Sequence, residues 1–298
     1  MSKDILLLGF PEYSQQARCI AAAAGLSYSH IKIHHFPDGE SQLILPAKLP
    51  KHVIFCRSLN EPNEKLIELI MAASSARKNG AQTIGLIAPY LCYMRQDKAF
   101  NPGEVVSQII LGELLATYFD QVLTIDAHLH RIEHLFQALP VKKAVNVTAT
   151  QPMAQFIEKN IDDAYIIGPD KESEQWVANI ARYSKLNYCI ASKQRFGDKE
   201  VEVTIPDADY FQRHIILVDD VASTGKTLLA VAQKLAKYQP ASISVLVTHA
   251  LFVNDAQEEL IAANVSNIWS CDSIPHPSNA IQLANLLAGE LIKMIELD

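Results

Sequence analysis

The run of apolar, mostly β-branched residues at 215–218 leads directly into two aspartates and then into a turn of small residues. Such a run is typical of a strand that is buried on both faces of a parallel sheet. Residues 228–237 continue with helical spacing, so the turn lies at the N-terminus of a helix. A strand, a turn and a helix in this order predict an α/β fold built on a parallel sheet.

The turn has the composition of a site for a phosphorylated sugar. Backbone N–H groups at a helix N-terminus are unpaired and aligned with the positive end of the helix dipole, which favours a phosphate. Gly225 lets the backbone approach a ligand closely, and two nearby threonines add hydroxyl donors. Two adjacent carboxylates repel polyphosphate and suit ribose hydroxyls instead. The predicted sugar-phosphate residues are Asp219, Asp220, Ser223, Thr224, Gly225, Lys226 and Thr227.

Two other interpretations of this segment are weaker. A nucleotide P-loop requires a glycine five residues before Gly225, where this chain has Asp220. Helix capping explains at most one of the two aspartates. The role of Lys226 stays open, because a lysine at this position either strengthens phosphate binding or points into solvent. The segment resembles the phosphoribosyl-binding motif that type I phosphoribosyltransferases share with phosphoribosyl pyrophosphate synthetases.

A second segment, residues 88–108, distinguishes these two families. It contains Arg95, Gln96 and Asp97 in succession, followed by an Asn-Pro-Gly turn at residues 101–103. Composition alone is equally consistent with a polar surface loop. The order of residues resembles the ATP-binding loop of phosphoribosyl pyrophosphate synthetases, and phosphoribosyltransferases lack it. The loop at residues 101–104 is short, as in the archaeal type of synthetase.

Further segments extend the resemblance over about residues 36–279. In the family, the segment containing Phe36, Asp38 and Glu40 reaches the adenine of ATP held by a neighbouring subunit. The resemblance also implies metal-associated roles and catalytic roles for four more residues. These are His128 and Asp170 for the metal, and Lys193 and Arg195 for catalysis.

The resemblance implies transfer of the diphosphoryl group of ATP to the 1-hydroxyl of ribose 5-phosphate, with Mg²⁺ as the cofactor. The segment after Asp170 departs from the family, which often has two glycines, or a basic residue and a glycine, where this chain has Lys171 and Glu172. Close approach of a ligand to that backbone is therefore in doubt. Two alternatives stay open, a catalytically silent regulatory relative and a phosphoribosyltransferase. The retained His128, Lys193 and Arg195 favour an enzyme.

A competing pattern is His-x-x-Glu-His, formed by His130, Glu133 and His134. On a helix this spacing is typical of a zinc protease, which needs a third ligand on a later helix. No residue nearby provides that ligand, and short patterns arise by chance in a chain with 10 histidines. The two histidines are predicted to be surface or hinge residues.

Composition limits the partners of this chain. A formal net charge of −7 gives no electrostatic basis for binding nucleic acid. No apolar run is long enough to span a membrane, and the first residues lead directly into a strand. The five cysteines are widely spaced, as expected of reduced core thiols. The sequence therefore predicts a soluble, cytoplasmic protein.

Strand-like and helix-like segments alternate along the whole chain, which predicts α/β architecture with parallel sheets. We expect two domains, residues 1–145 with the ATP-binding loop and residues 146–298 with the ribose-5-phosphate loop. The resemblance implies that both are phosphoribosyltransferase-like, each a mainly parallel sheet flanked by helices. It also implies that a last helix near residues 281–295 returns to the first domain, and that the protein is a homo-oligomer, dimeric or larger, with shared ATP sites.

Overall fold

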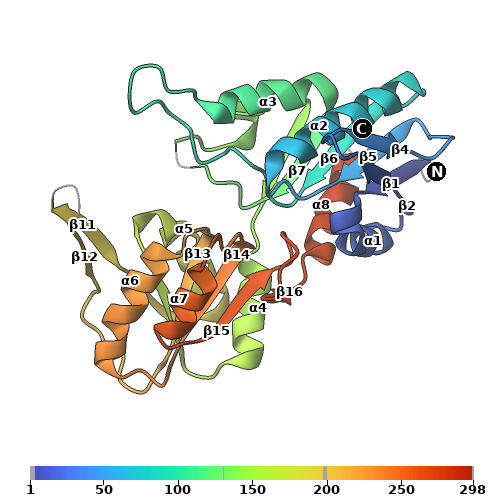
Figure 1. The fold of residues 1–298 in the computed structure, drawn as a ribbon. Helices are drawn as coiled ribbons and strands as arrows, with labels where there is room; N and C mark the ends of the chain where they lie inside the picture. The colour runs from blue at the N-terminus through green and yellow to red at the C-terminus, as the bar shows by residue number, and fades with distance from the viewer. Residues whose placement is uncertain (1–3, 130, 197–199, 297–298) are drawn as a thin grey trace. The chain divides into compact units, whose positions relative to one another are not determined.

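The structure is a computed structural model that describes residues 4–129, 131–196 and 200–296. The chain divides into two compact units (Figure 1). The N-terminal unit comprises Met1–Val147, Ser273–Pro275 and Leu283–Asp298. The C-terminal unit comprises Thr148–Asp272 and His276–Gln282.

The N-terminal unit is built on a six-stranded sheet in the order β2-β1-β5-β6-β7-β8, with every pair parallel. Its strands are β1 (Ile5–Gly9), β2 (Ser27–His30), β5 (His52–Cys56), β6 (Thr83–Ala88), β7 (Gln121–Ile125) and β8 (Lys143–Val147). Four helices flank it: α1 (Ser14–Ala23), α2 (Pro62–Lys78), α3 (Ser107–Tyr118) and α8 (Ala284–Glu296). Helix α8 packs on α1, and an antiparallel hairpin joins β3 (Lys32–His35) to β4 (Ser41–Ile44).

The C-terminal unit repeats this plan in the order β10-β9-β13-β14-β15-β16, again with parallel pairs. Its strands are β9 (Ala164–Gly168), β10 (Asn187–Ile190), β13 (His214–Ala222), β14 (Ser242–Ala250), β15 (Val265–Cys271) and β16 (Asn279–Ile281). Its helices are α4 (Thr150–Asn160), α5 (Glu174–Ser184), α6 (Lys226–Leu235) and α7 (Ala256–Ala262), and an antiparallel pair joins β11 (Ser192–Phe196) to β12 (Glu200–Thr204). Helices α4 and α5 contact each other, as do α6 and α7.

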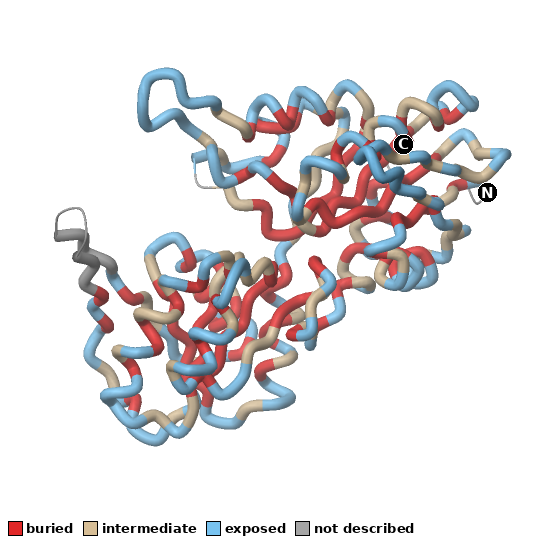
Figure 2. Tube along the Cα trace, viewed as in Figure 1, coloured by how far each residue is buried: buried red, intermediate tan, exposed pale blue. Residues whose placement is uncertain are grey.

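The central strands form the core of each unit, as the buried segments in Figure 2 show. All of β9 is buried, and so are residues 84–88 of β6. Helices cover both faces of such a sheet, so apolar side chains are needed on both sides of each strand. The predicted α/β class, with two parallel sheets flanked by helices, is confirmed.

Each sheet contains one point where the direction of strand addition reverses. In the N-terminal unit this switch point lies between β1 and β5, and in the C-terminal unit it lies between β9 and β13. The loops after two such strands diverge to opposite faces and leave a crevice at their carboxyl ends, where ligands of α/β proteins bind. The strand order therefore indicates one crevice in each unit.

The structure extends the strand predicted at residues 215–218. Strand β13 continues through both aspartates to Ala222, because the neighbouring β14 is also long and pairs Asp219 with Val247. The turn is accordingly shorter than predicted, and α6 begins at Lys226. Several polar or edge strands, among them β2, β8 and β16, were not predicted from the sequence.

The helices and the cysteines bear on two expectations from composition, the lack of a membrane span and the reduced state of the thiols. None of the helices in the described ranges is long and apolar enough to cross a membrane. All five cysteines are described and none forms a disulfide, and Cys56, Cys92 and Cys271 are buried. Burial raises the pKa of Cys92 to about 12, which keeps that thiol protonated at neutral pH.

Candidate functional site

Three carboxylates meet at the switch point of the C-terminal unit. Asp170 follows the end of β9 by two residues, and Asp219 and Asp220 lie near the end of β13. These two strands are hydrogen-bonded neighbours, so their carboxyl ends lie together. Strand order thus brings Asp170 to the two aspartates although about fifty residues separate them in the sequence.

The pKa of Asp219 is raised by its surroundings, which include the other two carboxylates. Burial raises it well above the ordinary value, and the negative charges of Asp220 and Asp170 raise it further. The backbone N–H of Asp220 donates a 3.0 Å hydrogen bond to Asp219 Oδ1, which offsets this only in part. A site with this excess of buried carboxylate charge favours a ligand that brings hydroxyl donors or positive charge.

The turn after β13 leads to the N-terminus of α6. Gly225 is the residue before the helix and has a φ of +66°, a left-handed conformation that costs glycine little. The first N–H groups of α6 have no hydrogen-bond acceptor within the helix, because no helical carbonyl lies one turn before them. Ser223 and Thr227 are half-buried, and Thr224 and Lys226 are exposed. The side-chain hydroxyls of Ser223, Thr224 and Thr227 make no hydrogen bond to any described residue, so they are available to a ligand.

The segment after β14 braces this turn, which the sequence did not indicate. The N–H of Leu251 donates to the carbonyl of Ala222 at 3.0 Å, and the N–H of Val253 donates to the carbonyl of Ser223 at 3.1 Å. These bonds use carbonyls of the turn, and none of its N–H groups has a backbone partner among the described residues. The bracing therefore holds the turn in place without occupying its donors.

Asp170 has a structural role besides its place among the carboxylates. Its side chain accepts a 3.0 Å hydrogen bond from the N–H of Glu172 and so caps a short 3₁₀ turn, Lys171–Ser173. A Cβ on Gly168 would lie 2.3 Å from Ser173 Oγ, so the glycine is required for this turn to pack against β9. Lys171 and Glu172, which depart from the family pattern, thus lie in the 3₁₀ turn that Asp170 caps.

The predicted ATP loop of the N-terminal unit lies between β6 and α3. Met94 is buried, and its carbonyl accepts a 3.1 Å hydrogen bond from the Gln108 side chain. Arg95 and Gln96 follow and are exposed. Asp97 forms a 3.2 Å ion pair with Arg131, so the structure engages it with a residue that the sequence did not single out. The buried residues of the loop anchor it and leave the guanidinium of Arg95 exposed.

The segment from Phe36 to Glu40 forms the tip of the β3–β4 hairpin. The N–H of Phe36 donates to the carbonyl of Glu40 at 2.8 Å, and Gly39 has a φ of +90°. Asp38 accepts a 3.1 Å hydrogen bond from the N–H of Glu40. All of these residues are exposed, and the ring of Phe36 is 41% exposed. The hairpin therefore presents an aromatic ring and two carboxylates away from its own unit.

The base of the hairpin is attached to α2. His35 Nδ1 lies 2.8 Å from Glu64 Oε1, and the Ser41 hydroxyl donates to Glu68 Oε1 at 2.7 Å. Within the described ranges, His35, Glu64 and Glu68 form the only group of His, Cys, Asp or Glu donors close enough together to hold one metal ion. Neither of the two residues predicted for the metal belongs to this group.

The predicted metal residues belong to different units. His128 follows β7 by three residues in the N-terminal unit and is half-buried, whereas Asp170 belongs to the C-terminal unit. The segment after His128 contains the zinc-protease pattern. His130 lies outside the described residues, and His134 precedes a 3₁₀ turn, Leu135–Gln137, instead of lying on an α-helix. The helical geometry that the pattern needs is therefore not found among the described residues.

The predicted catalytic residues lie on strand β11. The structure describes the backbone of Lys193 and Arg195, which pair with Val203 and Val201 of β12. Their side chains lie outside the described part of the structure.

Comparisons with known proteins identify related chains and a related fold. Residues 5–118 match the N-terminal domain of ribose phosphate pyrophosphokinase, and residues 133–284 match the phosphoribosyl transferase domain. A ribose-phosphate pyrophosphokinase of Methanopyrus kandleri is 28% identical over 283 residues, which cover 94% of this chain and 96% of the relative. Ribose-phosphate pyrophosphokinase 2 of Archaeoglobus fulgidus is 30% identical over 275 residues, covering 92% and 96%.

The fold is also similar to a solved structure. The crystal structure of phosphoribosylpyrophosphate synthetase from Mycobacterium smegmatis superposes with a TM-score of 0.83 at 18% identity, covering 99% of this chain and 100% of that chain. At this identity the likeness concerns the fold. The resemblance seen in the sequence motifs is thus matched by full-length relatives and by the fold.

Proposed function

The chain belongs to the ribose-phosphate pyrophosphokinase family, and from this premise we propose that it transfers the diphosphoryl group of ATP to the 1-hydroxyl of ribose 5-phosphate. The products are 5-phosphoribosyl 1-pyrophosphate, a precursor for nucleotide biosynthesis, and AMP. The observation that carries the proposal is the C-terminal switch point, where clustered carboxylates lie beside the N-terminus of α6.

Ribose 5-phosphate fits the C-terminal switch point in one orientation. Its phosphate would accept hydrogen bonds from Ser223, Thr224, Thr227 and the first N–H groups of α6, with Gly225 allowing close approach. Its ribose hydroxyls would donate to Asp219 and Asp220. In this orientation the anionic phosphate lies on the side away from the carboxylates that raise the pKa of Asp219.

ATP would bind the N-terminal unit through the loop that contains Arg95, Gln96 and Asp97. The exposed guanidinium of Arg95 suits bidentate contact with phosphate oxygens. Asp97 would act through its ion pair with Arg131, which ties the loop to the segment after His128. The hairpin tip with Phe36, Asp38 and Glu40 would contact the adenine of ATP bound to a neighbouring copy.

The reaction forms a bond from O1 of ribose to the β-phosphorus of ATP and breaks the bond from that phosphorus to the oxygen bridging the α-phosphate. The proton of the 1-hydroxyl leaves in the process. Such a transfer depends mainly on alignment and on positive charge around the phosphoryl oxygens. Lys193 and Arg195 are proposed to supply that charge from β11, the lysine as a point charge and the arginine as a fork.

The carboxylate chemistry of the site fits Mg²⁺. Burial and two further carboxylates raise the pKa of Asp219, and hard oxygen ligands of this kind are those that Mg²⁺ prefers. We propose Asp170 as a ligand of this ion in the C-terminal unit, and His128 as a metal-associated residue of the N-terminal unit. When bound, the ion would neutralise negative charge on the phosphates of ATP.

A second copy of the chain is proposed to cover the outer faces of α2 and α3. These helices contact each other in the N-terminal unit and carry five apolar side chains that are 37–60% exposed. The five are Ile67 and Met71 on α2, and Ile109, Ile110 and Leu114 on α3. Several exposed apolar side chains on two helices in contact are typical of interfaces. A homo-oligomer, dimeric or larger, would place one copy's hairpin near the ATP loop of another.

The test is to incubate the protein with ATP, Mg²⁺ and ribose 5-phosphate and to follow the products by phosphorus NMR. AMP and a sugar diphosphate should form together, and only when the sugar is present. Lys193→Ala should lose orders of magnitude in rate while ATP still binds, because the lysine acts mainly in the transition state. Lys159→Ala, which changes an exposed lysine of α4, is the matched control.

Two outcomes would contradict this proposal. Untouched ATP would favour a catalytically silent regulatory relative. Release of pyrophosphate from added phosphoribosyl pyrophosphate and a nucleobase would favour a phosphoribosyltransferase. Equal loss of ATP affinity and rate in Lys193→Ala would contradict the assigned role of the lysine while leaving the overall reaction intact.

A further inference from the structure

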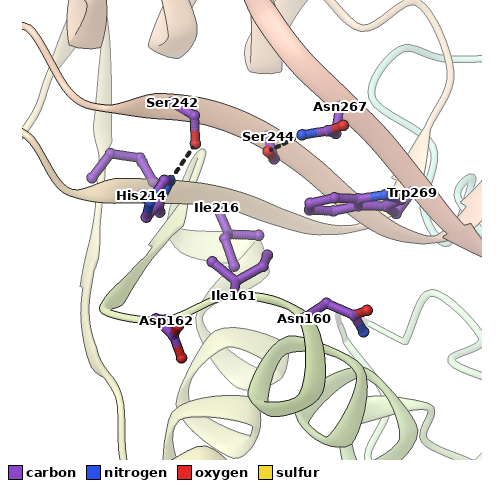
Figure 3. A pocket seen from close by; sticks show the side chains of 10 residues that line it. Asn160, Ile161, Asp162, His214, Ile216, Ser242, Ser244, Asn267 and Trp269 are labelled. Atoms are coloured by element: carbon purple, nitrogen blue, oxygen red, sulfur yellow. Dashed lines mark hydrogen bonds between the residues drawn. The ribbon is translucent and has the colours of Figure 1, made fainter.

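A pocket of about 410 Å³ lies in the C-terminal unit at the end of the sheet opposite the carboxylates. It is lined by the first residues of β13, β14 and β15 and by the end of α4 (Figure 3). From His214 at this end to Asp219 at the other, β13 spans roughly 16 Å. The pocket is therefore separate from the proposed sugar-phosphate site, and we name it the Trp269 pocket.

The sheet face in this pocket is unusually polar. Three neighbouring strands each contribute two residues spaced two apart, which point to the same face. The six are His214 and Ile216, Ser242 and Ser244, and Asn267 and Trp269. The intervening residues Ile215 and Ile243 belong to the buried apolar core, although Ile215 also borders the pocket. A parallel sheet covered on both faces needs apolar residues, so the polar set marks a part of the sheet that α4 covers incompletely.

Hydrogen bonds hold the polar groups in fixed orientations. His214 Nδ1 lies 2.8 Å from Ser242 Oγ, and Asn267 Nδ2 donates to Ser244 Oγ at 3.3 Å. Asn160 Nδ2 donates to the carbonyl of Phe156 at 2.7 Å. Each of these amides uses one of its two N–H groups in the bond, and its oxygen makes no hydrogen bond to a described residue, so the oxygens of Asn160 and Asn267 can accept from a ligand. Asp162 adds a carboxylate, which is a third acceptor group in the lining.

The charge of the lining excludes one large class of ligand. Asp162 carries the only permanent charge among the lining residues, and neither lysine nor arginine takes part. A phosphate would meet a carboxylate and several acceptor oxygens without a cation to pair with. The pocket therefore suits a ligand that donates hydrogen bonds and carries no phosphate.

An aromatic surface completes the pocket. Trp269 is half-buried, and its ring meets that of Phe156 edge to face at a centroid distance of 5.3 Å. Figure 3 shows the indole on the sheet side and Asn160 across the pocket on the helix side. A flat ring placed between them would stack on the indole and present N–H groups to the amide oxygens. The volume is within the range of small-molecule sites.

We propose that the Trp269 pocket binds a planar heteroaromatic compound that carries an amino group and no phosphate, of the chemical class of adenosine. Stacking on Trp269 supplies the contact area. The amide oxygens of Asn160 and Asn267 accept from the amino group and so select for it. The site is independent of the proposed transfer reaction, because its residues lie at the opposite end of the sheet.

The test uses the full chain labelled with 5-fluorotryptophan and observed by fluorine NMR. The chain has two tryptophans, and Trp176 is buried in α5, so it serves as an internal reference. Trp269→Phe assigns the signals. Adenosine should shift the Trp269 signal saturably and leave the Trp176 signal in place. AMP and inosine, which add a phosphate or replace the amino group, should shift it much less at equal concentration.

A pair of variants tests the hydrogen bonding. Asn267→Ala should weaken the adenosine response about tenfold, the loss expected for one hydrogen bond. Asn187→Ala, at an exposed position of the edge strand β10, is the matched control and should leave it unchanged. An unmoved Trp269 signal at millimolar adenosine would overturn the proposal. An equal response to AMP, or an unchanged response in Asn267→Ala, would overturn it as well.

Discussion

At the switch point of the N-terminal unit, between β1 and β5, a buried arginine is surrounded by partners. Arg57 Nε and one terminal nitrogen each lie 2.6 Å from a carboxylate, those of Glu12 and Glu68, and the guanidinium lies 4.1 Å from the centroid of the Phe10 ring. At the switch point of the C-terminal unit, Asp170, Asp219 and Asp220 meet instead, and the pKa of Asp219 is raised by the other two. The same strand order thus holds opposite charges in contact in one unit and like charges together in the other.

This difference shows that the topology sets the place of a site, whereas the side chains set its charge. In both units the strand order indicates a crevice at the carboxyl ends of the strands. In the N-terminal unit a guanidinium, an aromatic ring and two carboxylates contact one another at this position. In the C-terminal unit the carboxylates lower the stability of the free protein and create a demand for hydroxyl donors and cations. A binding site is therefore expected where the fold leaves charge uncompensated.

The largest expected effect concerns the C-terminal switch point. The double variant Asp219→Asn/Asp220→Asn should lose roughly 10²–10⁴-fold in kcat/KM for ribose 5-phosphate, if each carboxylate contributes ~1.5–3 kcal/mol through charge-assisted hydrogen bonds. Steady-state kinetics with AMP detection measures this. The matched control is Asp207→Asn/Asp209→Asn, which changes two exposed aspartates of the same unit. Comparable losses in both double variants would show that the effect is not specific to the switch point.

The second prediction concerns the N-terminal switch point. Arg57→Met should lower the free energy of unfolding by about 3–5 kcal/mol, because it leaves the buried Glu68 carboxylate without its cation. Urea unfolding measures the loss. The triple variant Arg57→Met/Glu12→Met/Glu68→Met should recover part of it, since both carboxylates leave together with the guanidinium, while Lys65 loses a partner, Glu12 at 3.9 Å. A fully stable Arg57→Met protein would show that this crevice is not held by charge balance.

The third prediction is a gain of stability at the C-terminal switch point, whereas the second is a loss of stability at the N-terminal one. The pKa of Asp219 is raised by burial first and then by Asp220 and Asp170, so its ionised form destabilises the folded state above the ordinary aspartate range. Asp219→Asn should raise the Tm at neutral pH, by roughly 2–4 °C if ~1 kcal/mol of repulsion is relieved. The gain should vanish as the pH falls below the ordinary aspartate pKa, where the folded and unfolded states both bind the proton. Thermal unfolding across this pH range tests the sign, and an equal gain at acidic pH would refute it.

The smallest expected effects belong to the turn before α6. Thr224→Val should raise the KM for ribose 5-phosphate by about 5–10-fold, the loss of one hydrogen bond to phosphate. Lys226→Ala should raise it by less than about threefold, because this lysine is exposed and solvent screens its charge. The effect of Lys226→Ala should also shrink as salt is added. If Lys226→Ala proves the more damaging change at high salt, the lysine binds the phosphate directly.

The sequence predicted the α/β class because its buried strands are short apolar runs between helical segments. It missed the extent of β13, since aspartates are poor strand formers and only the pairing with β14 keeps Asp219 and Asp220 in the strand. It also missed the hairpin at β3 and β4, whose residues are mostly polar and partly exposed. Local composition gives little signal for strands that are stabilised by their neighbours.

For the candidate site, local motifs indicated the turn before α6 and the two aspartates of β13. The third carboxylate, Asp170, was assigned by resemblance, and its proximity to Asp219 follows from the strand order. The ion pair of Asp97 with Arg131 and the network of Arg57 join residues more than thirty and more than forty positions apart. Contacts over such separations depend on the tertiary fold, so neither periodicity nor spacing could reveal them.

The most direct test of the difference between the two switch points is a crystal structure of the protein with ribose 5-phosphate and Mg²⁺. We expect the phosphate at the turn of Ser223 to Thr227 and the ribose hydroxyls against Asp219 and Asp220, with the Arg57 network of the N-terminal unit unchanged. A sugar phosphate bound at Arg57, or a reversed orientation with the phosphate against the two aspartates, would contradict the account.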